Sequence, residues 1–329
     1  MSTLAPTLEA FFTHRLTSER DASAHTVAAY RDTWRLLLLF AQDRTGKPPS
    51  QLDFADLDAG LVTAFLTRLE TERGNSVTTR NARLTAIRSL FRYAALRHPE
   101  HAGLIQRVLA IPSKRHAQTM VCFLTPQEVD ALLAAPDRTG WYGRRDHTLL
   151  TLTVQTGLRV SELTNLTISD LHLSTGACVH CLGKGRKHRV TPLTTQTVAV
   201  LTVWLRERAG NPTDPLFPSR RGRPLTTDAV AWLLAKYVDT AIHHCPTLAS
   251  KNVTPHVLRH TAAMRLLQAG VDTSVIALWL GHESVQSTQV YLHADLALKE
   301  QALARTTPPG TAPGRYRPPD KLLAFLEAL

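Results

Sequence analysis

The sequence predicts a mainly α-helical protein of two domains, with a small β-hairpin in the second domain. Apolar residues recur at helical spacing in both halves of the chain, and a basic segment without any period separates the halves at residues 111–120. At 329 residues the chain is long enough for two separate cores. We expect domains at residues 1–112 and 122–300, a linker at 113–121, and a Pro- and Gly-rich tail with a short apolar helix at 301–329.

Two amphipathic helices dominate the first domain. The apolar residues of the first helix share one face and are Val27, Tyr30, Trp34, Leu37, Leu38 and Ala41. The second helix begins at Ser76, a typical N-cap, and ends before Pro99. Its polar faces carry arginines without an acidic residue four positions later, so they would repel one another unless an anion lay alongside. We therefore expect a phosphate backbone to contact Arg80, Arg83, Arg88 and Arg92.

The second domain is predicted to begin with a capped helix. Thr125 is the N-cap, Pro126 occupies the first helical position, and Glu128 completes a capping box. Further elements are expected as helices at residues 144–156 and 162–166 and as a β-hairpin within residues 176–193. The turn of this hairpin is cationic, because it carries Lys184, Arg186 and Lys187.

Two further helices place polar side chains that could carry chemistry. Thr254 and Pro255 repeat the pattern of N-cap and first-position proline, so a helix should run from there to Gly270. On this helix His256 and Arg259 face the same side, and its first turn favours an anion. A short helix should begin at Asp272 and end at Gly281, with His282 on the turn that follows. A helix should resume near 284–287 and carry Tyr291. Earlier in the chain, Arg159 lies at the break after Gly157.

The charge of the chain indicates a polyanionic partner. Lys and Arg exceed Asp and Glu by 38 to 27, which gives a net charge of +11, and the pI is near 9.9. A membrane partner is not expected, because the longest strongly apolar run, Leu36–Ala41, is far shorter than the roughly 20 residues that span a bilayer. Glu9 lies where a signal peptide would be basic and then apolar, so we expect a cytoplasmic protein.

Two groups of residues have types that bind metals. Cys178 and Cys181 lie near several histidines, but no second CxxC or HxxxH pair stands at zinc-finger spacing. His256 and His260 have the spacing of a zinc pair, but the next residue is Val257 where a zincin helix has glutamate. We therefore expect no metal and no cofactor, and a buried, hydrogen-bonded structural role for His260.

Six of these residues form an ordered series: Arg159 in TGLRVSEL, Lys184 in GKGRKHRVTPL, His256 and Arg259 in HVLRHTAA, His282 in LGH, and Tyr291 nine residues later. This series resembles the tyrosine recombinase (phage-integrase-type) family over about residues 122–300. The first half of the chain is similar to the family's helical, SAM-like core-binding domain. Each short motif alone could occur by chance, but six in the right order are specific. The resemblance implies two domains that close around DNA as a C-shaped clamp.

The resemblance also implies a role for each matched residue. Tyr291 would attack a DNA phosphodiester, giving a 3′-phosphotyrosine and a free 5′-hydroxyl, while Arg159 and Arg259 would hold the non-bridging oxygens. The remaining implied roles are His256 as general base or hydrogen-bond partner, Lys184 as the acid for the leaving 5′-oxygen, His282 as a phosphate contact, and Glu162 as a support for Arg159. Lys187 stays open as an alternative acid, and Tyr316 as an alternative nucleophile.

The function that follows is site-specific recombination of double-stranded DNA through a Holliday junction, without metal or ATP. The resemblance implies a homotetramer on two DNA sites, with partner recombinases as an open alternative, and a C-terminal helix that docks on its own domain or on a neighbouring protomer. A recombinase of a mobile element fits better than a large phage integrase, because no further arm-binding domain is evident before residue 10. Two other functions stay open: DNA relaxation like that of a type IB topoisomerase, and DNA binding by a catalytically silent accessory protein.

Overall fold

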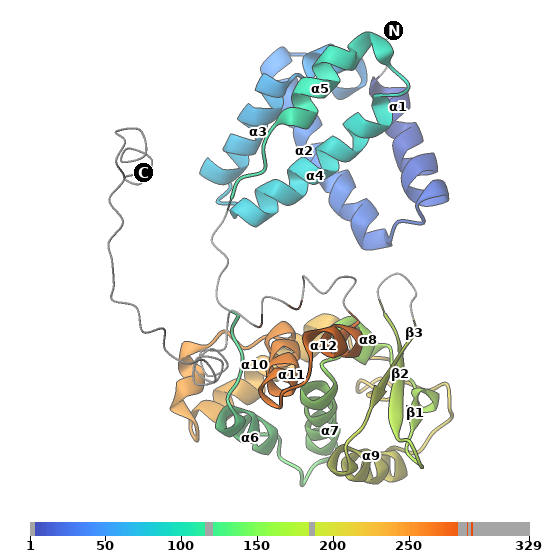
Figure 1. Cartoon of the computed structure of the whole chain (residues 1–329), viewed down its shortest axis with the longest axis vertical. Helices are drawn as coiled ribbons and strands as arrows, with labels where there is room; N and C mark the ends of the chain where they lie inside the picture. Colours follow the sequence, from blue (N-terminus) through green and yellow to red (C-terminus); the bar gives the residue numbers. More distant parts are fainter. Residues whose placement is uncertain (1–3, 116–120, 184–187, 282–287, 289–290, 292–329) are drawn as a thin grey trace, which may run out of the picture. The chain divides into compact units, whose positions relative to one another are not determined.

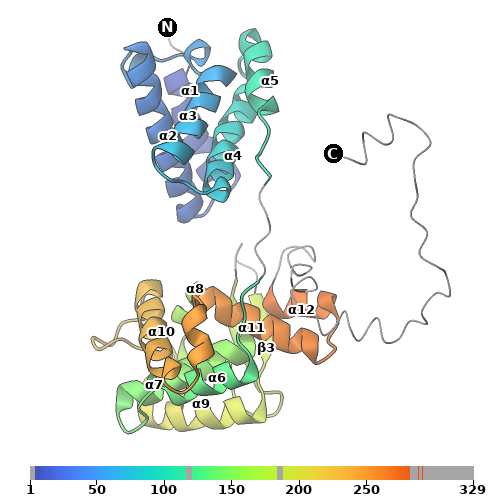
Figure 2. The same cartoon turned by 90° about the vertical axis from the view of Figure 1, so that its left-hand side faces the viewer.

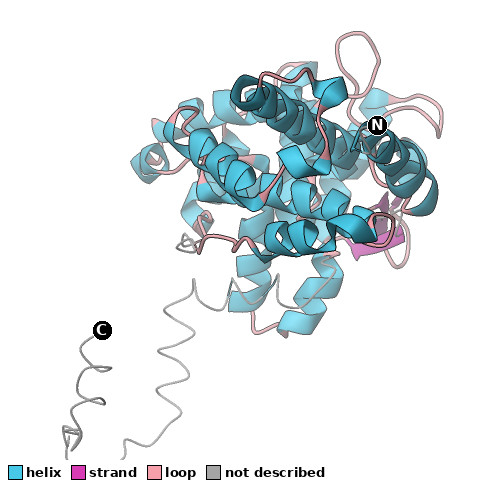
Figure 3. Cartoon of the chain, turned by 90° about the horizontal axis from the view of Figure 1, so that it is seen from above, coloured by secondary structure: helices cyan, strands magenta, loops and turns pink. Residues whose placement is uncertain are grey.

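The chain divides into two compact units, Met1–Gln118 and Thr119–Leu329. The computed structural model describes residues 4–115, 121–183, 188–281, 288 and 291. Helices make up most of both units, and the strands are confined to one small sheet in the second, which confirms the predicted fold class (Figures 1 and 3). Within these ranges no helix combines the length and the apolar character that a membrane span requires.

The first unit is built from helices around its own core. They are α1 (Leu4–Ala10), a π-helical segment (Phe11–Glu19), α2 (Ala24–Thr45), α3 (Ala59–Thr71), α4 (Val77–Ala94) and α5 (Ala102–Ala110), with 3-10 turns at Pro49–Gln51, Phe54–Asp56 and Pro99–His101. The predicted N-cap of α4 is confirmed, because the Ser76 hydroxyl accepts a hydrogen bond from the Thr79 N–H at 3.2 Å. Trp34 and Leu37 of α2 are buried in the same core as Phe91 of α4.

The second unit surrounds a central helix. Its elements are α6 (Pro126–Ala134), α7 (Trp141–Thr156), α8 (Val160–Thr164), β1 (Leu171–His172), β2 (Cys178–Leu182), β3 (His188–Pro192), α9 (Thr195–Arg208), α10 (Thr227–Ile242), α11 (Pro255–Gln268) and α12 (Thr273–Leu280), with 3-10 turns at Ile168–Asp170 and Pro246–Ser250. The central helix is α7, which packs against α6, α9 and α11 (Figure 1). Figure 2 shows α8, α11 and α12 grouped within this unit.

Strands β2 and β3 form the predicted hairpin, and β1 adds an unpredicted third strand in the antiparallel order β1-β2-β3. Cys181 pairs with Arg189, and both side chains are buried on the face that packs on the unit. Cys178, three residues before Cys181, lies on the opposite face, since side chains alternate along a strand. In the described ranges no group of three or more His, Cys, Asp or Glu residues is arranged to hold a metal ion.

The predicted caps of the second unit set the ends of the site helices. The capping box of Thr125 and Glu128 is formed. Thr254 caps α11 through the Val257 N–H, and Asp272 caps α12 through the Ser274 N–H. Gly281 ends α12 in the left-handed conformation, with φ of 65°. These caps fix where α11 and α12 begin and where α12 stops.

Gly157, at the end of α7, is expected to tolerate no side chain. Its φ is 63°, and a Cβ there would lie 2.7 Å from Leu280 Cδ2 and 3.0 Å from Ala262 Cβ. Gly157→Ala should therefore lower the free energy of unfolding by about 2–5 kcal/mol, from left-handed strain and overpacking together. Gly176→Ala is the matched control, because Gly176 has φ of 76° and open space around it. Urea unfolding should show a loss of only about 1–2 kcal/mol for the control, and equal losses in the two variants would contradict the packing argument.

Candidate active site

The site starts where α7 ends and α8 begins. Gly157 turns the chain, and Arg159 is the residue that precedes α8. The backbone N–H of Arg159 donates to Glu162 Oε2 at 2.8 Å, and its guanidinium donates to Glu162 Oε1 at 2.7 Å. The Glu162 side chain is only 2% exposed. One buried carboxylate therefore holds both the backbone and the guanidinium of Arg159.

Helix α11 contributes Arg259, which is almost completely buried. Its exposed fraction is 2%, and its guanidinium donates to the carbonyl of Gly157 at 2.7 Å and to the carbonyl of Leu280 at 2.6 Å. These two bonds connect α11 to the end of α7 and to the end of α12. The position of the Arg259 side chain is thus fixed by the protein itself.

Three successive carbonyls at the end of α12 each accept a hydrogen bond from a different arginine. The Trp279 carbonyl accepts from Arg189, the Leu280 carbonyl accepts from Arg259 at 2.6 Å, and the Gly281 carbonyl accepts from Arg159 at 2.9 Å. The last carbonyls of a helix have no partner within the helix, and they carry the negative end of its dipole. The end of α12 therefore gathers three guanidiniums from β3, α11 and the start of α8.

Positive charge exceeds negative charge in this cluster. Glu162 pairs with Arg159 and with Arg189, whose Nη2 lies 2.6 Å from Glu162 Oε2. The pKa of Arg259 is lowered to about 10, mainly by burial and also by the positive charges of Arg159 and Arg189. At that pKa the Arg259 guanidinium is still cationic at neutral pH. The cluster thus suits an anionic ligand.

Two histidines of α11 lie beside this cluster. The rings of His256 and His260 meet edge to face, with centroids 4.2 Å apart. Burial lowers the pKa of His256, and the positive charges of Arg259 and Arg159 act in the same direction. His256 is therefore mainly neutral at pH 7, the state in which an imidazole can accept a proton.

The phenol of Tyr291 lies inside the site and contacts His260. Tyr291 is 2% exposed, and its hydroxyl and His260 Nδ1 are hydrogen bonded at 2.9 Å. Burial raises the pKa of Tyr291, and the charge of Arg259 opposes that rise. His260 is half-buried and not buried as predicted. It forms a hydrogen bond, as expected, but its partner is the candidate nucleophile. The sequence did not indicate this contact, since it assigned the catalytic contact to His256.

The match to known proteins extends over both units. Residues 122–297 match the phage integrase family, and residues 9–98 match the phage integrase N-terminal SAM-like domain. The chain is 57% identical over 328 residues to a Sinorhizobium fredii protein whose name describes it as integrase/recombinase y4rC, covering 100% of this chain and 99% of that protein. It is also 34% identical to the tyrosine recombinase XerC of Pelobacter propionicus, covering 90% and 93%. The chain is a tyrosine recombinase of the phage integrase family.

Among solved structures, the XerH site-specific recombinase bound to a palindromic difH substrate has the same fold as this recombinase. The TM-score is 0.67 and the sequence identity is 24%, with 87% of this chain and 81% of the XerH chain covered.

Four of the predicted site residues of this recombinase lie outside the described residues. They are Lys184, Arg186 and Lys187, which lie in sequence between β2 and β3, and His282, which follows Gly281. The described structure brings together Arg159, Glu162, His256, Arg259 and Tyr291. It also adds Arg189, which the sequence did not single out, although an arginine at a buried position of a strand that alternates buried and exposed is an unusual feature.

The arginines of α4 are less free than the sequence suggested. The guanidinium of Arg88 donates to the carbonyl of Ile111, and that of Arg83 donates to Thr33 Oγ1 at 3.1 Å. Arg80 is 5% exposed and donates to the carbonyl of Pro112 at 3.2 Å. It also donates to Asn81 Oδ1 at 3.1 Å on α4 itself. The contact of Arg80 with DNA stays a prediction. Arg92 is exposed.

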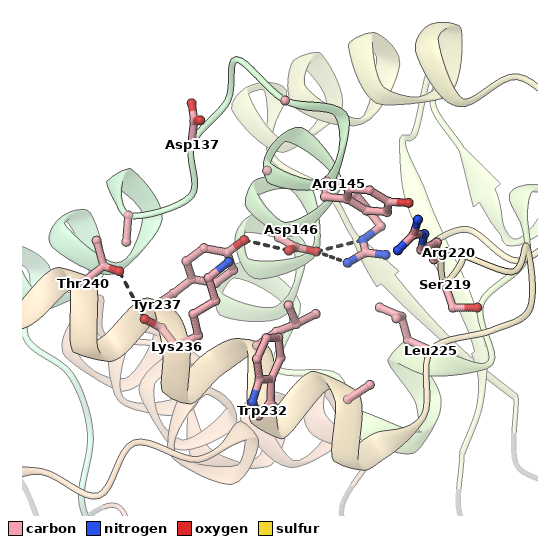
Figure 4. Close-up of a pocket in the computed structure, with 16 residues that line it drawn as sticks. Asp137, Arg145, Asp146, Ser219, Arg220, Leu225, Trp232, Lys236, Tyr237 and Thr240 are labelled. Atoms are coloured by element: carbon pink, nitrogen blue, oxygen red, sulfur yellow. Dashed lines mark hydrogen bonds and ion pairs between the residues drawn. The ribbon is translucent and has the colours of Figure 1, made fainter.

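A separate hollow of about 720 Å³ lies near the other end of α7. Arg145 and Asp146 form a buried ion pair at 2.7 Å beside it, and the Tyr237 hydroxyl donates to Asp146 at 2.7 Å (Figure 4). Burial raises the pKa of Tyr237, and its hydrogen bond to Asp146 acts in the same direction. At a rise of about 1.5 Å per residue, Arg145 and Gly157 are roughly 18 Å apart along α7. This hollow therefore contains none of the predicted site residues.

Proposed function

We propose that this recombinase cuts and rejoins DNA through Tyr291. Its phenolic oxygen forms a bond to the scissile phosphorus, the bond from phosphorus to the 5′-oxygen breaks, and the products are a 3′-phosphotyrosine and a 5′-hydroxyl. The observation that carries this proposal is a buried phenol in the same site as three guanidiniums that converge on the end of α12. Two of these guanidiniums share the Glu162 carboxylate, and the charge of the third, Arg259, acts on the phenol. A tyrosine in that setting lies near a cationic cluster.

The two arginines matched to the family would supply most of the electrostatic stabilisation. We propose that Arg159 and Arg259 bind the non-bridging oxygens, where charge develops during phosphoryl transfer. One ion pair at 4 Å is worth about 4 kcal/mol at an effective dielectric constant of 20. Two such pairs, held in place by Glu162 and by backbone carbonyls, would act without a divalent cation. We accordingly propose a reaction that needs no metal.

The tyrosine proton needs an acceptor. A free phenol with a pKa near 10 is ionised to only about one part in a thousand at neutral pH, and burial raises the pKa of Tyr291 further. We propose His256 as the general base, because its lowered pKa keeps it neutral. His260 is a second candidate, since its ring is hydrogen bonded to the phenol. Lys184 is proposed as the acid for the leaving 5′-oxygen, with Lys187 as the alternative, and His282 as a phosphate contact.

Rejoining would use the energy stored in the phosphotyrosine bond. A 5′-hydroxyl from another strand can attack the phosphorus and displace Tyr291, so no ATP is required. Exchange of strands between two duplexes through a Holliday junction then yields recombinant DNA. This reversal is what distinguishes a recombinase from a nuclease.

The proposed partner is double-stranded DNA with a specific recombination site. The net charge of +11 favours a polyanion, and the XerH and Tn1549 integrase structures that resemble this fold are complexes with DNA. We propose that the two units close around the duplex as a C-shaped clamp and that four copies assemble on two sites. The element that carries the gene is proposed to be mobile. Arg80, Arg83, Arg88 and Arg92 remain proposed backbone contacts, and so do Arg186 and Lys187.

One assay series tests the proposed function. A nicked duplex that carries the target site is incubated with the protein in EDTA and without ATP, and a covalent adduct linked to the 3′ end is expected. Two labelled duplexes should then exchange strands. Adducts without exchange would favour relaxation of the topoisomerase kind, and binding without any adduct would favour an accessory DNA-binding protein.

The cleavage rate is expected to fall in acid because of His256. Its pKa lies below the ordinary value of 6.5, so the neutral base is lost, and the rate falls, only below that pH. The free energy of unfolding should also fall in acid, because His256 binds its proton at a higher pH in the unfolded chain than in the folded chain. Single-turnover cleavage between about pH 5 and 8 should show this acid limb, and His256→Gln should remove it. A limb that persists in His256→Gln and disappears in His260→Gln would assign the base to His260.

A further inference from the structure

We propose that Arg189 on β3 is a positioning residue that aligns Arg159 for the scissile phosphate. The proposal rests on the proposed function, in which Arg159 binds a non-bridging oxygen. Arg189 is 8% exposed and lies on the face of the sheet that packs on the unit. It therefore acts through its neighbours and not through a surface contact.

The contact that matters is the one between Arg189 and Glu162. Arg189 Nη2 lies 2.6 Å from Glu162 Oε2, and the same oxygen accepts the backbone N–H of Arg159 at 2.8 Å. The other oxygen of Glu162 accepts from the Arg159 guanidinium at 2.7 Å. Rotation of the carboxylate would change both of its bonds to Arg159. Arg189 opposes that rotation, because it is bonded to one of the two carboxylate oxygens.

A second contact of Arg189 fixes the acceptor of Arg159 at the end of α12. Its Nη1 donates to the Trp279 carbonyl, two residues before the Gly281 carbonyl that accepts from Arg159. A Cβ on Gly281 would lie 3.1 Å from Arg189 Cδ and 3.9 Å from Arg159 Nη1, so the aliphatic part of Arg189 passes close to this turn. Arg189 thus touches both groups that hold the Arg159 guanidinium, namely Glu162 and the end of α12.

The charges around Glu162 favour a positioning role for Arg189 over a contribution to folding stability alone. A single ion pair would neutralise Glu162, yet Glu162 is shared by two arginines. Sharing leaves Arg159 less completely neutralised than an exclusive pair would, so more of its charge is available to an anion. Both arginines donate through both Nη atoms to protein groups, but the side chain of Arg159 is 29% exposed and that of Arg189 only 7%. This difference assigns the phosphate contact to Arg159 and the support to Arg189.

A double-mutant cycle tests the proposal. Arg189→Gln, Arg159→Ala and the double variant are compared by single-turnover cleavage of the nicked substrate, with DNA affinity measured separately. Arg189→Gln should slow cleavage by about 10- to 100-fold, the scale expected for a misplacement of about 1 Å, with little change in DNA affinity. In the Arg159→Ala background the same substitution should change the rate by less than about threefold, because the group it positions is already gone.

Arg145→Gln is the matched control. Arg145 forms a comparable buried ion pair, with side-chain exposures of 6% and 3% for Arg145 and Asp146, but it lies beside the separate hollow in Figure 4. Each substitution removes an arginine from a buried carboxylate, Arg189 from Glu162, which keeps Arg159, and Arg145 from Asp146, so both should lower the urea midpoint. Only Arg189→Gln should lower the cleavage rate of the folded protein.

Arg189→Lys covers the case in which the glutamine variant does not fold. A lysine keeps the charge beside Glu162 but cannot contact Glu162 and the Trp279 carbonyl in the same forked geometry. We expect a cleavage rate between those of the wild type and Arg189→Gln. The proposal is overturned if Arg189→Gln, or Arg189→Lys where the glutamine variant is unfolded, cleaves at the wild-type rate. It is also overturned if the loss is equal in both Arg159 backgrounds. Failure of the wild type itself to form an adduct would instead overturn the proposed function.

Discussion

Tyr291→Phe is expected to form no covalent adduct with the nicked substrate. The substitution removes only the hydroxyl oxygen, which is the proposed nucleophile, and leaves the ring in its buried position. The lost hydrogen bond to His260 should cost about 0.5–1.5 kcal/mol of stability, so the protein should fold and bind DNA. Denaturing gel electrophoresis of the labelled 3′ strand measures the adduct, and a gel shift measures binding.

Tyr237→Phe provides the control for that experiment. Tyr237 is also a buried tyrosine with a hydrogen-bonded hydroxyl, donated to Asp146 at 2.7 Å, and it lies in the same unit beside the other end of α7. Its loss should cost about 1.5–3 kcal/mol because the partner is charged, yet the adduct should still form. An adduct from Tyr291→Phe would show that another tyrosine attacks, with Tyr316 as the next residue to test.

Arg259→Lys should slow cleavage by about 10²–10³-fold while DNA affinity changes little. Lysine keeps the charge but cannot span the carbonyls of Gly157 and Leu280 and also present a fork to the phosphate. Loss of one such preorganised donor typically costs 10²–10³ in rate. Affinity depends on many phosphate contacts, so one buried arginine contributes little to it.

The control is Arg265→Lys on the same helix. Arg265 is exposed and six residues beyond Arg259, so it shares the helix without sharing the cluster. Its substitution should change the cleavage rate by less than about twofold. Comparable losses of cleavage rate in the two variants would indicate that α11 tolerates no change in either arginine. The proposal that Arg259 binds a non-bridging phosphate oxygen would then lose its support.

Local signals in the sequence predicted most of the helical frame. Thr125, Thr254 and Asp272 cap the helices that they were expected to cap, because N-cap preference depends on a side chain and a backbone N–H only a few residues apart. Gly157 and Gly281 end helices in the left-handed conformation for an equally local reason. Strand β1, with only two residues, has too short a pattern to recognise.

Contacts between distant segments escaped prediction. Arg189 and Glu162 are 27 positions apart, and His260 and Tyr291 are 31 apart, so no spacing rule connects them. The same applies to α4, where Arg80 and Arg88 donate to the carbonyls of Pro112 and Ile111, although the sequence pointed to a phosphate backbone as their partner. Pairings of this kind depend on how α11, α12 and β3 pack, which periodicity alone does not determine.

Because three arginines bind successive carbonyls at the end of α12, the number of residues in this helix determines whether those carbonyls reach the arginines. Removal of one residue between Asp272 and Gly281 would turn the last carbonyls by about 100° and shift them by about 1.5 Å. Arg159, Arg189 and Arg259 would then lose their acceptors together. Substitutions of the outward side chains of α12 should be tolerated, whereas an insertion or deletion in this helix is expected to abolish the proposed cleavage.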